Sequence, residues 1–164
     1  MTYGYGVEKP FSYPSKLEEK LGVKVINAGV SGEESSDGLK RLPKFLKGKP
    51  DIVILCHGAN DILRKNSMKL MKENLLAMVD MIQESGAKVI LVGVPDISFS
   101  VFSPHSIYEE IAKEKNVLYE DKVIPYIELR RNLKSDYIHP NEKGYEMMAD
   151  AFLEIIYDNN LVSK

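Results

Sequence analysis

The run DIVILCHGAND at residues 51–61 decides the fold class of this chain. It is apolar without interruption from Ile52 to Cys56, as expected of a strand that is covered on both faces of a sheet. Gly58 ends the strand and opens a turn that carries two polar side chains, Asn60 and Asp61. The run therefore predicts a buried strand with polar side chains just beyond its carboxyl end.

Three other segments have the composition of strands, and helical patterns separate them. The other predicted strands cover residues 23–27, 88–94 and 117–119. Helices are predicted at residues 14–21, at residues 36–46 with a disturbance at Pro43, after a Ser67 cap as far as Gly86, and after an Asn141 cap. Strands that alternate with helices form parallel βαβ units, so the sequence predicts a layered α/β domain with its ligand site beyond the carboxyl ends of the strands.

The composition is that of one ordinary globular domain spanning residues 1–164. Hydrophobic residues make up 44% of the chain, charged residues 28%, and the formal net charge is -2, which argues against disorder and against a nucleic-acid partner. No apolar run reaches the roughly 18 residues of a membrane span, and no signal peptide is visible. The single cysteine, Cys56, leaves no internal disulfide, which permits the cytoplasm without excluding export.

Asp136 and His139, in the segment DYIHPN at residues 136–141, could form an acid–base pair. Acyl transfer needs a base that takes a proton from a nucleophile, and this base needs a carboxylate that fixes its tautomer. A spacing of three lets one turn bring the carboxylate beside the ring, while Pro140 keeps His139 out of helical geometry. The alternative is that Asp136 only caps a turn and His139 is a surface residue. The motif alone favours neither interpretation.

Gly32 and Asn60 suit the stabilisation of an oxyanion, which needs preorganised N–H donors. A glycine lets a backbone N–H approach closely, and an asparagine amide offers two N–H groups. Taken singly, a turn glycine and a turn asparagine are the better interpretations. His57, at the end of the strand that precedes Asn60, could line a site or be a structural histidine whose hydrogen bonds are satisfied.

In order and spacing, three segments resemble conserved blocks of the SGNH hydrolases, the GDSL-like lipase/esterase family. VINAGVSG at residues 25–32 resembles the second block, residues 50–61 the third, and DYIHPN the fifth. The thioesterase/lysophospholipase/arylesterase branch is the most similar part of that family. The resemblance implies a flavodoxin-like three-layer sandwich around a parallel sheet of five strands.

The resemblance also implies a function and a role for each of the four residues. It implies a serine ester hydrolase that acts on a small-molecule ester or thioester through an acyl-enzyme intermediate, without a metal or a cofactor. In that function His139 is the general base, Asp136 orients it, and Gly32 and Asn60 are the oxyanion donors.

The family's first block, Gly-Asp-Ser-Leu, is matched here only from its last position onward. Met1 stands where the leucine would be, and TYGYGV at residues 2–7 resembles the stretch that follows the block. The nucleophilic serine would precede Met1, so we expect that the natural product begins upstream. A substitute is disfavoured, because Ser31 lacks the last glycine of a Gly-x-Ser-x-Gly elbow and Cys56 lies in an apolar strand.

Without that serine and the strand before it, we expect a chain that is inactive or nearly so and whose sheet lacks its first, central strand. The neighbouring strands would pair directly, or a second copy of the chain would fill the slot in a homo-oligomer, or the fold would be unstable. The alternative function is a noncatalytic acyl- or ester-binding module. A flavodoxin-like phosphate binder is disfavoured, since no glycine-rich phosphate loop is present.

The segment from Pro95 to Tyr108 follows a predicted strand and carries Phe99 and Phe102. These aromatic residues could form an acyl-binding wall or be plain packing residues, and the sequence supports both interpretations equally.

Overall fold

The computed structural model describes residues 1–95 and 103–162 and divides the chain into two compact units. One unit consists of Met1–Ser31 with Lys122–Lys164, and the other of Gly32–Asp121. The predicted α/β class with a parallel sheet is confirmed. The expectation that residues 1–164 form a single domain stays a prediction.

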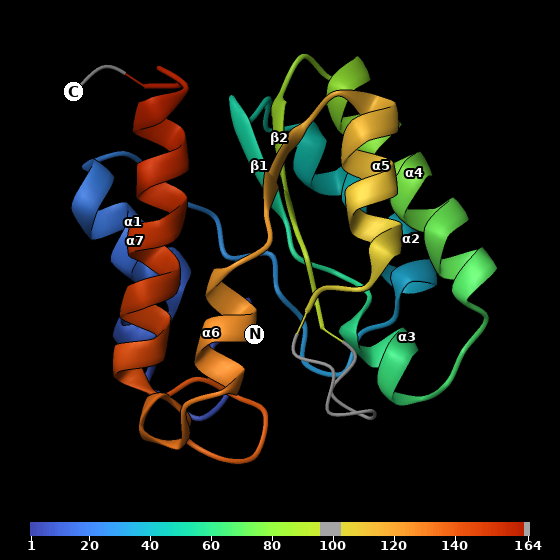
Figure 1. The fold of residues 1–164 in the computed structure, drawn as a ribbon. Helices are drawn as coiled ribbons and strands as arrows, with labels where there is room; N and C mark the ends of the chain where they lie inside the picture. The colour runs from blue at the N-terminus through green and yellow to red at the C-terminus, as the bar shows by residue number, and fades with distance from the viewer. Residues whose placement is uncertain (96–102, 163–164) are drawn as a thin grey trace. The chain divides into compact units, whose positions relative to one another are not determined.

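The sheet belongs to the unit formed by Gly32–Asp121 and contains three parallel strands in the described residues (Figure 1). The strands are β1 (Ile52–Leu55), β2 (Lys88–Val92) and β3 (Leu118–Glu120), in the order β1-β2-β3. Val53 pairs with Val89, and Leu91 pairs with Tyr119. From Val89 to Val92 the strand β2 is no more than 4% exposed, which explains why its sequence is continuously apolar.

Four helices of the same unit lie along the chain between or before these strands. They are α2 (Ser35–Leu46), α3 (Ala59–Leu63), α4 (Met68–Glu84) and α5 (Ser106–Lys115). Both α4 and α5 pack on β2, and α2 packs on α4. The Ser67 hydroxyl accepts the Leu70 N–H and begins α4 as predicted, whereas Pro43 lies inside α2 without ending it.

In the other unit, two long helices pack along each other (Figure 1). These are α1 (Tyr13–Leu21) and α7 (Glu142–Asp158), accompanied by the shorter α6 (Val123–Glu128) and by 3-10 turns at Lys9–Phe11 and Arg131–Leu133. The rings of Tyr13 and Phe152 meet edge to face at 5.0 Å. Asn141 caps α7 as predicted, with its side-chain oxygen accepting the Gly144 N–H at 3.1 Å.

The predicted strand at residues 23–27 is wrong. These residues join no strand ladder in the described part of the chain, and Val23 and Ile26 are 48% and 57% exposed. The Val25 N–H donates to the Glu18 carboxylate, and the Asn27 side chain accepts the Gly29 N–H in an Asx turn. Local contacts of this kind satisfy single groups, whereas a strand needs a partner for every second residue.

Direct pairing of the strands beside the missing one, the first of the three alternatives for the sheet, stays a prediction. A missing central strand and a homo-oligomer through the sheet stay predictions. Of the proposed acyl-binding wall, Phe99 and Phe102 lie outside the described residues, and Tyr108 is a fully buried packing residue of α5. Within residues 1–95 and 103–162, no helix has the length and hydropathy needed to cross a membrane.

Tyr108 fastens α5 to the carboxyl end of β1. Its hydroxyl donates to the His57 carbonyl at 2.8 Å, and burial raises the pKa of the phenol far above its ordinary value, so the group remains a donor. Gly58, at φ +100, passes so close that a Cβ there would collide with the Tyr108 hydroxyl. The turn between β1 and α3 is thus shaped by a buried phenol.

Replacing Tyr108 by phenylalanine should lower the free energy of unfolding by about 1–3 kcal/mol, because the buried His57 carbonyl loses its donor. Urea titration followed by circular dichroism measures the change. Tyr126→Phe is the matched control, since the Tyr126 side chain is 43% exposed and its contact with Arg130 uses the ring face. Equal effects of the two substitutions would contradict the importance of this hydrogen bond.

Candidate active site

The segment from Lys134 to Pro140 forms a small closed loop that presents Asp136 and His139. Lys134 and Pro140 face each other in an isolated antiparallel bridge. The Ser135 N–H donates to the His139 carbonyl at 2.8 Å, which closes the loop from within. The sequence folds this way because Pro140 cannot continue a helix and Asn141 starts one directly afterwards.

The Asp136 carboxylate holds this loop and the histidine ring at the same time. Its Oδ1 accepts the N–H groups of Ile138 and His139 at 2.8 and 2.7 Å, and its Oδ2 lies 2.8 Å from His139 Nδ1. Burial by itself would raise the pKa of Asp136, but the His139 and Ile138 N–H donors and the His139 ring outweigh it and lower the pKa to about 2. Asp136 therefore both caps the turn and contacts the ring, while the catalytic role of the pair stays a prediction.

The ionised state of the Asp136 carboxylate fixes the tautomer of His139. A carboxyl with a pKa of about 2 is ionised at neutral pH and can only accept hydrogen bonds, so His139 Nδ1 must carry the proton. The Nε2 lone pair of the neutral ring is then available to take a proton. The His139 side chain is 28% exposed, and the Tyr5 ring lies against it with 4.4 Å between centroids.

An ion pair between Lys134, the first residue of the loop, and the buried Glu128 holds the loop in place. Lys134 Nζ lies 3.1 Å from the Glu128 carboxylate and also donates to the carbonyls of Glu128 and Tyr137. Burial raises the pKa of Glu128 despite the opposing effect of Lys134, and its Oε1 has no hydrogen-bond partner among the described residues. Sequence reasoning missed this pair, because nothing in the order of residues marks Glu128 as buried.

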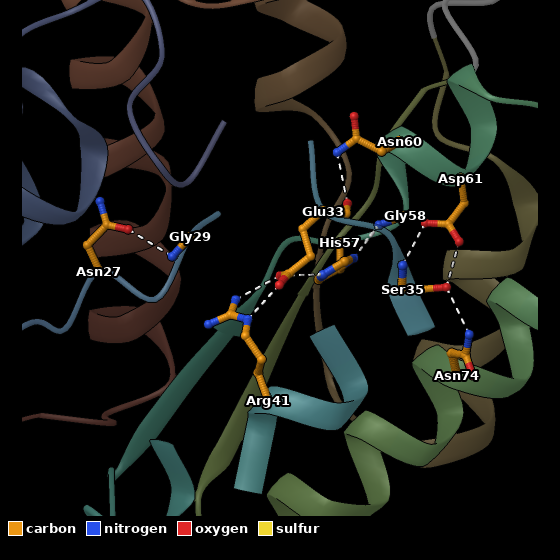
Figure 2. Close-up of polar contacts among 10 residues, drawn as sticks. All are labelled: Asn27, Gly29, Glu33, Ser35, Arg41, His57, Gly58, Asn60, Asp61 and Asn74. Atoms are coloured by element: carbon orange, nitrogen blue, oxygen red, sulfur yellow. Dashed lines mark hydrogen bonds and ion pairs between the residues drawn. The ribbon is translucent and has the colours of Figure 1, made fainter. Parts of the chain in front are cut away.

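Gly32 and Asn60, the predicted oxyanion donors, both belong to the unit formed by Gly32–Asp121. Gly32 has φ +76, a conformation that favours glycine. The Asn60 amide donates to the carbonyl of Glu33, the next residue, at 2.9 Å (Figure 2). The Asn60 side chain thus contacts Glu33, the residue that directly follows Gly32.

Asp61, the neighbour of Asn60, fastens α3 to the start of α2. The Asp61 carboxylate is 4% exposed and accepts both the N–H and the hydroxyl of Ser35, at 2.8 and 2.6 Å (Figure 2). The Ser35 hydroxyl also accepts the Asn74 amide at 3.0 Å, which brings α4 into the same network. Every group in this buried network is hydrogen-bonded, as a stable interior requires.

The candidate nucleophiles that the sequence disfavoured do not gain support from the structure. Ser12, another serine near the start of the chain, is fully buried, and its hydroxyl donates to the Lys9 carbonyl. Cys56 is half-buried and directly follows β1, and Ser31 is exposed. Among the residues described, no group of three or more His, Cys, Asp or Glu side chains is placed to hold a metal ion.

The fold and the His139–Asp136 pair define the class of the protein. A histidine with a free nitrogen, oriented by an ionised carboxylate, is the base that acyl transfer requires. Such a pair on an α/β fold with a parallel sheet is compatible with a carboxylic ester hydrolase.

Comparison with known proteins agrees with this class. The sequence profile of the GDSL-like Lipase/Acylhydrolase family matches residues 1–147. An arylesterase of Vibrio mimicus is 30% identical over 161 residues, which cover 92% of this chain and 80% of that protein. Thioesterase 1/protease 1/lysophospholipase L1 of Escherichia coli (strain K12) is 28% identical over 163 residues, which cover 92% and 76%.

A solved structure gives the same result. The psychrotrophic esterase EstA of Pseudoalteromonas sp., in a form inhibited by monoethylphosphonate, superposes with a TM-score of 0.83 and 26% identity over 97% of this chain and 94% of that one. The chain therefore belongs to the GDSL-like lipase/acylhydrolase family, and the resemblance found in the sequence is confirmed.

The low pKa of Asp136 predicts a change of stability in acid. The folded pKa of about 2 lies below the ordinary 3.8, so this carboxylate stabilises the fold above about pH 3.8, and that contribution is lost as the pH falls towards 2. The unfolding free energy of the wild type should therefore exceed that of Asp136→Asn at pH 6, and the difference should shrink between pH 4 and pH 2. Urea titrations of both proteins across this range measure it. A difference that stays constant over the range would contradict the assignment.

Proposed function

We propose that this family member is a serine ester hydrolase that cleaves small-molecule esters or thioesters through an acyl-enzyme intermediate. In this proposal His139 is the general base, Asp136 orients it, and Gly32 and Asn60 donate to the oxyanion. The observation that carries the proposal is the 2.8 Å contact between His139 Nδ1 and Asp136 Oδ2, because it leaves Nε2 as the proton acceptor.

Acylation would begin with a serine hydroxyl whose proton passes to His139 Nε2 while its Oγ attacks the substrate carbonyl carbon. Negative charge then collects on the former carbonyl oxygen, where the Gly32 N–H and the Asn60 amide donate hydrogen bonds. When the tetrahedral intermediate collapses, the bond to the alcohol or thiol breaks. The leaving group departs with the proton held by His139.

Deacylation would repeat these steps with water. A water molecule gives a proton to His139 Nε2 and attacks the acyl carbon, the same two donors stabilise the second oxyanion, and the carboxylic acid is released as the serine regains its proton. Every proton in this cycle passes through His139, so the carboxylate of Asp136 is needed to stabilise the imidazolium ion in both halves.

The relatives support esters and thioesters as the substrate class. Those named above are called an arylesterase, a thioesterase/protease/lysophospholipase and an esterase, and apart from the protease name each describes cleavage of an acyl bond to oxygen or sulfur. An acyl group joined to an alcohol or a thiol is the substrate that the proposed chemistry requires.

We further propose that the 164-residue chain alone has little or no activity, because none of its residues aligns with the nucleophilic serine of the family's Gly-Asp-Ser segment. The support is that residues 2–7 resemble the stretch after the family's first block, with Met1 at the place of its leucine. The second candidate function, a noncatalytic acyl- or ester-binding module, has the same support and applies if no such segment is encoded upstream.

The test compares the 164-residue chain with a form that includes the in-frame upstream coding sequence, using p-nitrophenyl acetate in a stopped-flow assay. The longer form should show a burst of p-nitrophenol equal to the enzyme concentration. The 164-residue chain should show none, with residual catalysis no greater than the 10³–10⁴-fold over water that is known when a triad residue is removed. A full burst from the 164-residue chain would refute the proposal about the nucleophile.

In the longer form, His139→Ala should lower kcat on the order of 10⁴-fold or more, because the base is lost. His105→Ala is the matched control, since the His105 ring accepts the Ile107 N–H at the start of α5. Similar kcat values for the wild type and His139→Ala would exclude His139 as the base. A stop codon or unrelated sequence directly before Met1 would favour the binding module.

A further inference from the structure

The carboxylate of Glu33, the residue after Gly32, is held by two cationic or polar side chains (Figure 2). Arg41 donates to both carboxylate oxygens, through Nε to Oε1 and through Nη2 to Oε2 at 2.7 Å. His57 Nε2 lies 3.3 Å from Oε2. The Glu33 side chain is 9% exposed, and the Arg41 guanidinium lowers the pKa of its carboxyl against the effect of burial. A two-pronged arginine–carboxylate pair of this kind fixes geometry as well as charge.

His57 is not a second base, because both of its ring nitrogens are in use. Nδ1 accepts the Gly58 N–H at 3.0 Å, so in the neutral ring Nε2 carries the proton and donates to Glu33. Gly38 in α2 leaves the space for this ring, since a Cβ at position 38 would collide with His57 Nε2. The ring therefore links Glu33 to the turn at which α3 begins.

The backbone of Glu33 makes a second link to the same turn. Its carbonyl accepts the Asn60 amide at 2.9 Å, and Asn60 lies in the first turn of α3. Glu33 is thus fastened to α3 twice, through its carboxylate by way of His57 and Gly58, and through its carbonyl by way of Asn60. Gly32 precedes it directly in the chain, so the position of Glu33 restricts the positions that the Gly32 N–H can take.

We propose that Glu33, held by Arg41 and His57, is a positioning residue that fixes the Gly32 N–H and the Asn60 amide relative to each other. This inference rests on the proposed function, in which those two groups donate to the oxyanion. Such donors must lie about 2.7–3.1 Å from the oxyanion, and a misplacement of about 1 Å can cost on the order of 10²-fold in rate. Because the oxyanion forms only after substrate has bound, the effect falls on kcat and leaves KM nearly unchanged.

Glu33→Gln is the sharpest substitution for this test. Glutamine keeps the shape of the side chain but replaces one carboxylate oxygen with an NH₂ group, which would point at the N–H donors of Arg41 or His57. In the catalytic form, kcat per active site should fall about 10- to 100-fold with KM nearly constant. The amplitude of the p-nitrophenol burst counts competent active sites, which separates this loss from a loss of folded protein. Asp37→Asn, with the same change of charge at a 60% exposed side chain on α2, is the control.

A double-mutant cycle separates failure of this inference from failure of the proposed function. Asn60→Ala should lower kcat by about 10²–10³-fold, as loss of one oxyanion donor does. The double variant Glu33→Gln/Asn60→Ala should lose less than the product of the two single losses, because part of the effect of Glu33 passes through Asn60. Losses that multiply in full, or a Glu33→Gln as active as Asp37→Asn, would overturn the positioning role and leave the hydrolase intact. An Asn60→Ala with wild-type kcat would overturn the oxyanion assignment itself.

The tautomer of His57 gives a second measurement that needs no activity and uses the 164-residue chain. Long-range ¹H–¹⁵N spectra should show His57 protonated at Nε2 and unprotonated at Nδ1, and Glu33→Gln should shift the Nε2 resonance, because the acceptor of its proton changes. A wild-type ring that is protonated at Nδ1 would overturn the proposed link between Glu33 and Gly58.

Discussion

The arrangement of residues 32–63 depends on the buried carboxylate of Asp61. It accepts the N–H and the hydroxyl of Ser35 and so fastens the first turn of α2 to α3, while Asn74 of α4 completes the network. A carboxylate that is 4% exposed is costly unless such donors surround it, so this contact forms only when all three helices are in place. Gly32 lies three residues before Ser35, and Asn60 directly precedes Asp61, so each proposed donor is close in sequence to one partner of this contact. The proposed oxyanion donors therefore take their positions in part from a contact that is itself buried.

The features predicted correctly from the sequence have determinants that lie within a few residues. Ser67 and Asn141 each cap a helix through an N–H three residues further on. The contact between Asp136 and His139 also spans three residues, and Pro140 restricts the backbone between them and the next helix. The apolar runs of β1 and β2 predicted strands because burial on both faces leaves a continuous pattern. In all of these, the residues that form the contact are neighbours in the printed sequence.

The features that the sequence did not reveal depend on contacts between distant residues. Residues 23–27 have the alternation of a strand, but a strand exists only where another pairs with it, and local hydrogen bonds of Val25 and Gly29 take the place of a ladder. Glu33 and His57 are separated by 24 positions, and only their contact shows that the histidine is a donor. A signal was present in Gly38, an unexpected glycine inside a helix, whose reason is the ring that passes beside it.

The two halves of the proposed chemistry are prepared by different physical means. The base is oriented within a loop of seven residues, where a single carboxylate satisfies two backbone N–H groups and the ring. The oxyanion donors are held by side chains from α2, α3 and the end of β1, through a charged pair and a shared histidine. A substitution in the loop can change the base and leave the donors in place, whereas a substitution of Arg41 or His57 reaches the donors without touching a substrate. Preorganised donors need no rearrangement when charge develops, so in the proposed chemistry this second, distributed arrangement is the part of the fold that would stabilise the oxyanion.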